Sequence, residues 1–144
     1  MIDLVNLART FHGHLGLLAA VALLHPAITL RGAARLRPGT RWSVAGATAL
    51  VTVTGAMGWW LYPGYRAQDK PRLLQEAFPV ALAFETKEHL AFYAVVLAWA
   101  ACGLALGTEG AGPRRAARVA YGVAAALTVA VGVLGSIVGS AVAG

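Results

Sequence analysis

Four long apolar stretches without a formal charge limit this chain more than any other feature. They cover residues 11–30, 42–65, 90–108 and 119–144, which are 20, 24, 19 and 26 residues long. A helix needs about 20 apolar residues to cross the hydrocarbon core of a bilayer, so each stretch can span a membrane once. Only 12% of the residues are charged, against roughly 25% in soluble domains. The sequence therefore predicts an all-α integral membrane protein with four spanning helices.

Turn signals and aromatic residues indicate where these helices end. We expect single helices over about residues 4–30, 42–62, 84–107 and 114–143. Pro63-Gly64 is a typical helix break, so residues 63–83 should form a loop at one membrane surface. Trp59 and Trp60 mark the same surface, because tryptophan concentrates at membrane–water interfaces. Short connections between consecutive helices predict an antiparallel up-down four-helix bundle, as a single transmembrane domain.

The two halves of the chain resemble each other. His14-Leu15 near the start of the first stretch corresponds to His89-Leu90 before the third, 75 residues later. Residues 52–58 correspond in the same way to residues 129–135, with an offset of 77. Tandem helical hairpins of this kind usually pack about a pseudo-two-fold axis. Such an axis is expected to bring His14 and His89 toward each other.

Basic residues are distributed unevenly between the two membrane surfaces. The connections after the first and third helices carry seven of them: Arg31, Arg35, Arg37, Arg41, Arg114, Arg115 and Arg118. The opposite surface has five bases balanced by five acids, so the seven bases less Glu109 give the net charge of +6. The positive-inside rule predicts that the arginine-rich connections are cytoplasmic and both termini periplasmic, in a bacterial inner membrane. We expect this charge to contact the lipid bilayer rather than nucleic acid.

Two histidines on opposed helices suit a b-type haem. Bis-imidazole ligation needs two neutral imidazoles at one depth with a flat apolar slot between them. We therefore predict one haem b near the outer face, with His14 and His89 as axial ligands. His12 points roughly 200° away from His14 on a regular helix, so both cannot serve one centre. Glycines would let the porphyrin approach the backbone, and arginines would pair with its propionates. The residues expected in these two roles are Gly55, Gly58, Arg66 and Arg72.

Two other interpretations stay open. Polar residues also join membrane helices through hydrogen bonds, and Gly135 and Gly139 have the small-xxx-small spacing of helix contacts. The chain would then be a non-enzymatic accessory or assembly subunit of a larger membrane complex. Alternatively, Glu85 and His89 share one helical face at i, i+4, and with His14 they could ligate a transition-metal ion. Residues 85–88 could equally form a solvated first turn of the third helix.

With its paired-helix repeat, His14 and His89, the chain resembles the small four-helix membrane b-type cytochromes and the haem A synthase-like units. In those families the odd-numbered helices supply histidines to haem. The resemblance implies electron transport between a quinone or a partner redox protein and another carrier. No hydrolytic or nucleotide-binding motif accompanies these residues, and whether the protein is an enzyme stays open.

Overall fold

Four long helices form the whole of the described structure, a computed structural model that covers residues 4–31 and 36–143. They are α1 (Leu4–Thr29), α2 (Pro38–Glu76), α3 (Phe78–Gly107) and α4 (Ala111–Ala143). Each helix is long and apolar enough to cross a membrane. The predicted all-α class, with four helices that are each long and apolar enough to span a membrane, is therefore confirmed. Arg35, one of the predicted cytoplasmic arginines, lies outside the described residues.

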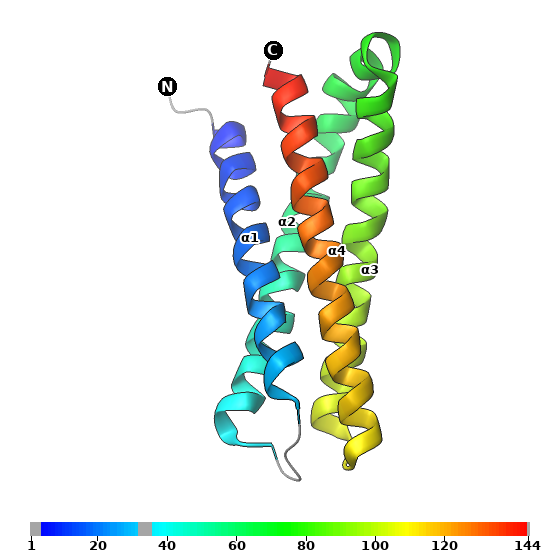
Figure 1. Cartoon of the computed structure of the whole chain (residues 1–144). Coiled ribbons are helices and arrows are strands. Elements are labelled where there is room, and N and C mark those ends of the chain that lie inside the picture. Colours follow the sequence, from blue (N-terminus) through cyan, green and yellow to red (C-terminus); the bar gives the residue numbers. More distant parts are fainter. Residues whose placement is uncertain (1–3, 32–35, 144) are drawn as a thin grey trace.

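The helices lie side by side as a bundle (Figure 1). Each helix packs against the next one along the chain, and α4 also packs against α1. As a result α1 and α3 sit diagonally across the bundle, where they barely touch. The α2–α3 connection lies at the same end of the bundle as the N- and C-termini (Figure 1). We refer to this end as the hairpin end, and to the opposite end as the linker end.

A single residue reverses the chain between α2 and α3. Ala77 has φ −149° and ψ 58°, and its N–H donates to the Leu73 carbonyl at 2.9 Å. Its carbonyl accepts from the Val80 N–H, also at 2.9 Å. Pro79 stands in the first turn of α3, where the missing N–H costs no helical hydrogen bond. The two helices are therefore joined with almost no loop.

The predicted loop over residues 63–83 is wrong, because all of these residues except Ala77 belong to α2 or α3. Helix α2 continues through Pro63 and Pro71 to Glu76, and α3 already begins at Phe78. Each proline removes one backbone donor, but contacts between the paired helices offset this loss: Tyr65 and Leu73 are buried against α3. The early start of α3 also places residues 85–88 inside the helix, not in a solvated first turn.

The apolar layer covers only part of α2. At 1.5 Å per residue, the 39 residues of α2 extend about 58 Å, roughly twice the thickness of a hydrocarbon core. Trp42 and Trp59 are both highly exposed, and their 17-residue separation corresponds to about 26 Å along the axis. Tryptophan at both boundaries is typical of a membrane-spanning segment. We infer that the α2–α3 hairpin beyond Trp59 projects out of the hydrocarbon.

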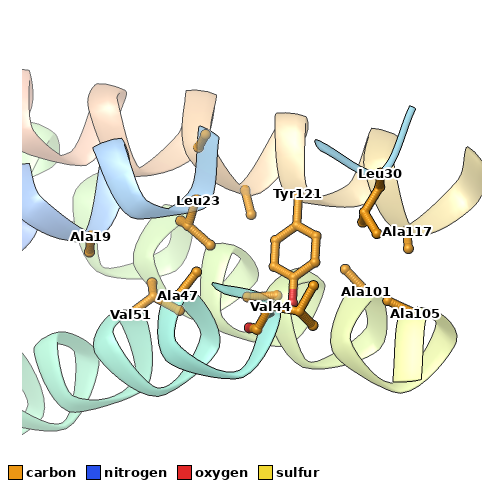
Figure 2. Packing of buried hydrophobic residues seen from close by; sticks show 13 residues of the cluster. Ala19, Leu23, Leu30, Val44, Ala47, Val51, Ala101, Ala105, Ala117 and Tyr121 are labelled. Carbon is orange, nitrogen blue, oxygen red and sulfur yellow. Dashed lines mark hydrogen bonds between the residues drawn. The ribbon is translucent and has the colours of Figure 1, made fainter. Parts of the chain in front are cut away.

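Small residues fill the interior between the projecting hairpin and the linker end. The largest buried cluster contains eight alanines: Ala19, Ala47, Ala98, Ala101, Ala105, Ala117, Ala124 and Ala125. Tyr121 is the exception in size; it is fully buried and extends from α4 toward Val44 on α2 (Figure 2). Its hydroxyl donates to the Val44 carbonyl at 3.2 Å and lies 2.8 Å from Thr48 Oγ1. The Tyr121 hydroxyl therefore ties α4 to α2 across a mostly apolar interior.

Replacing Tyr121 with Phe should remove this tie while keeping the ring in place. We expect the free energy of unfolding to fall by about 1 kcal/mol, the usual net contribution of one hydrogen bond. Denaturant unfolding in detergent, followed by circular dichroism, measures the change. Tyr93 is 55% exposed, so Tyr93→Phe serves as the matched control and should have no effect. Equal stabilities of the two variants would contradict the role assigned to the Tyr121 hydroxyl.

Candidate functional site at the hairpin end

The buried face of α1 leads to His12 rather than to His14. Ala19, Leu23 and Pro26 are buried at helical spacing, and the position seven residues before Ala19 on this face is His12. The His12 side chain is accordingly half-buried, whereas His14 is exposed. The imidazole that α1 contributes to the bundle interior is therefore the one that the haem hypothesis left aside.

The equivalent face of α3 carries a lysine. Lys87 follows buried Phe84 by three residues and precedes buried Ala94 by seven. Only 12% of its side chain is exposed. Lys87 Nζ lies 2.8 Å from Glu88 Oε1 and 4.4 Å from the centroid of the Phe84 ring. The ammonium group thus has one carboxylate and one aromatic face as partners, which offset its removal from water.

Two glycines make room for these long polar side chains. A Cβ atom at Gly58 of α2 would lie 3.1 Å from His12 Cε1, and one at Gly135 of α4 would lie 3.7 Å from Lys87 Cδ. Each even-numbered helix therefore offers a glycine to one polar side chain of an odd-numbered helix. Lys87 follows His12 by 75 residues and Gly135 follows Gly58 by 77, the same offsets that the sequence repeat shows.

Ion pairs and stacked rings join the projecting ends of the helices. Arg9 of α1 pairs with Asp69 of α2 at 3.2 Å, and Lys70 of α2 pairs with Glu85 of α3 at 2.7 Å. The rings of Tyr65 and Phe84 stack with centroids 3.4 Å apart. The groups that gather at this level form what we call the hairpin-end polar cluster: Arg9, His12, Asp69, Lys70, Glu85, Lys87 and Glu88.

The two predicted haem ligands lie on the surface of the bundle. His14 Nδ1–H donates to the Thr10 carbonyl at 2.8 Å, and His89 Nδ1–H donates to the Glu85 carbonyl at 2.7 Å. Both side chains are exposed, and they belong to the diagonal helices α1 and α3. The interior between these helices at this level is occupied by His12 and Lys87. The structure therefore does not bring the two imidazoles into one shared interior gap.

The other predicted site residues have contacts of their own. A Cβ atom at Gly55 would lie 3.0 Å from Val95 Cγ2, so Gly55 lets α3 approach α2. Arg66 is exposed, and Arg72 donates to the Val142 carbonyl at 3.4 Å. The Glu85 carboxylate is engaged by Lys70. Among residues 4–31 and 36–143, no three His, Cys, Asp or Glu side chains lie close enough to hold a metal ion.

A groove between α2 and α3 opens toward the membrane beside the polar cluster. Its volume is about 480 Å³, and its walls include the aromatic side chains of Trp59, Tyr62 and Phe92. Glu88 is the one charged side chain that lines it. Ionisable side chains are rare beside the apolar layer, so Glu88, although paired with Lys87, marks a candidate site. The size of the groove is in the range typical of small-molecule sites.

Comparison of the chain with protein-family models finds no match, and comparisons with curated proteins and with solved structures find none either. The arrangement of the side chains themselves is therefore the basis for any functional proposal.

Gly58 offers a direct test of the His12 contact. Gly58→Leu should destabilise the protein by about 1–3 kcal/mol, because the new side chain overlaps the imidazole. In the double variant with His12→Ala the loss should shrink, since the obstructing ring is gone. Thermal unfolding in detergent gives the comparison. A Cβ atom at Gly46 of the same helix would meet nothing within 4 Å, so Gly46→Leu is the matched control and should not destabilise. Additive losses in the double variant would contradict the contact.

Proposed function

We propose that the protein is a non-enzymatic subunit of a larger membrane complex, which it joins through the outward face of α4. The observation that carries this proposal is a row of small, exposed residues in the half of α4 near the hairpin end: Gly132, Ser136, Gly139 and Ser140. A Cβ atom at Gly132 or Gly139 would have no neighbour within 4 Å. Glycine gives no benefit to a helix in contact with lipid alone, but it lets a partner helix approach closely.

The hydroxyl groups on this face support the same proposal. Ser136 donates to the Gly132 carbonyl at 3.1 Å, and Ser140 donates to the Ile137 carbonyl at 2.8 Å. Both groups are satisfied within α4, so they tolerate lipid. They can also rotate toward an acceptor on a neighbouring helix. Gly135, in contrast, already accommodates Lys87 within the chain and is not available to a partner.

Substitution of the α4 face should release the partner. We expect Gly139→Leu to shift the protein from a complex to the single chain in cross-linking and native mass measurements on membranes solubilised in mild detergent. Ala100 is exposed on α3, away from this face, so Ala100→Leu is the matched control and should leave the complex intact. A single chain as the sole species in the unmodified protein would contradict the proposal.

Haem binding is the second candidate, and one specific observation favours it. In His14 and His89 the Nδ1–H is bound to a backbone carbonyl, which leaves the Nε2 lone pair directed away from its own helix. Metal-ligating histidines are usually oriented by such a bond. Because both rings face outward, each would ligate a haem together with a residue of a partner chain. The protein would then take part in electron transport.

A visible spectrum tests this candidate. Protein purified in mild detergent from cells supplied with haem precursor should show a Soret band with reducible α and β peaks, weakened in His14→Ala and in His89→Ala and lost in the double variant. His25 is exposed and bound to Ser43, so His25→Ala is the control that keeps the band. A colourless preparation that still contains the partner would contradict haem binding and would support the role as a non-enzymatic subunit.

We also propose that the four helices form an up-down bundle whose two halves are related by a pseudo-two-fold axis. We propose further that the hairpin end lies on the periplasmic side of the membrane. The paired contacts of His12 with Gly58 and of Lys87 with Gly135 support the axis. The arginines concentrated at the linker end support the orientation. An impermeant thiol reagent applied to intact cells with a permeabilised outer membrane should label Gln68→Cys but not Glu109→Cys. Labelling of Glu109→Cys but not of Gln68→Cys would contradict the proposed orientation.

A further inference from the structure

We propose that the groove between α2 and α3 binds the head group of a quinol, a neutral aromatic ring with two hydroxyl groups and an apolar tail. The groove combines two kinds of wall. Its part nearest the hairpin end carries Glu88 and the aromatic rings of Trp59 and Tyr62, and the rest is mostly apolar, lined by residues such as Gly55, Val95 and Phe92 together with the hydroxyl of Thr52. This gradient matches an amphiphile whose head lies at the membrane surface and whose tail enters the hydrocarbon.

The aromatic walls favour a flat head group. Trp59 and Tyr62 come from α2 and Phe92 from α3, so rings border the groove from both helices. Aromatic rings attract one another in offset-stacked or edge-to-face geometry. Ala91, with its short side chain, also lines the groove and leaves room beside these rings. An aromatic ring fits such a slot better than a branched or spherical head group does.

The charge of the groove favours a neutral ligand. Glu88 Oε1 is already paired with Lys87 Nζ at 2.8 Å, so the carboxylate and the ammonium together carry no net charge. A cationic ligand would have to compete with Lys87 for this carboxylate. A quinol hydroxyl can donate to a carboxylate that is already paired, because the two oxygens of a carboxylate accept about four hydrogen bonds. The Thr52 hydroxyl, which also lines the groove, donates to the Thr48 carbonyl and accepts from Trp99.

Retention of tritium-labelled decylubiquinol by the full chain in phosphatidylcholine nanodiscs tests the proposal. The protein should bind the quinol saturably, and Glu88→Gln should weaken the binding about tenfold, as expected for loss of one charge-assisted hydrogen bond. Ala91→Phe should abolish saturable binding, because it fills the groove without changing any charge. Ala100→Phe, on the exposed face of the same helix, is the matched control and should bind like the unmodified protein.

Three results would overturn the proposal. The first is retention no greater than that of empty nanodiscs, which means that only annular lipid occupies the groove. The second is saturable binding that persists unchanged in Ala91→Phe, which places the quinol elsewhere. The third is displacement of the quinol by decyltrimethylammonium at equal concentration, which indicates a site for cationic head groups. Elution of each variant as a monodisperse species in size-exclusion chromatography shows that the binding losses do not come from misfolding.

Discussion

Close contact between small residues is the interaction on which this bundle depends. In hydrocarbon, the apolar surface of a helix gains nothing by leaving lipid for another helix, so association must come from van der Waals packing and hydrogen bonds. The alanines of the main cluster supply the packing, and Tyr121 with Thr48 supplies one hydrogen-bonded tie. Close packing of small residues leaves little interior space. A long side chain that enters the bundle therefore needs a small residue opposite it on the neighbouring helix.

At the hairpin end, glycines provide the space for two long polar side chains. His12 enters opposite Gly58, and Lys87 enters opposite Gly135. Each pair joins an odd-numbered helix to an even-numbered one, and the two pairs are related by the offsets of the sequence repeat. The repeated feature that faces the interior is thus a polar side chain opposite a glycine. His14 and His89 repeat as well, with the same bond from Nδ1 to a backbone carbonyl, but they do so on the outer surface.

The number and class of the helices could be predicted because each uncharged stretch is long enough to cross the hydrocarbon core once, but the full lengths of α2 and α3 could not. The inward faces could not, since helices that are apolar all round have no amphipathic stripe to show which side is buried. The inward position of His12 could have been inferred from its seven-residue spacing to Ala19. However, the alanine, glycine and leucine residues on the two faces of α1 are all apolar, so the sequence does not show which face is buried. The helical course of residues 63–76 was missed because Pro63 is a strong local signal. It is overridden by contacts distant in sequence, in particular the Tyr65–Phe84 stack.

The position of Glu88 next to Lys87 gives α3 a further property. Consecutive residues of a helix point about 100° apart, so when Lys87 faces the interior, Glu88 faces the side of α3 that meets α2. Their ion pair therefore connects the buried cluster to the lipid-facing groove. A neutral pair in this position costs less than either charge alone. The same two residues thus contribute both to the packing at the hairpin end and to the wall of the groove.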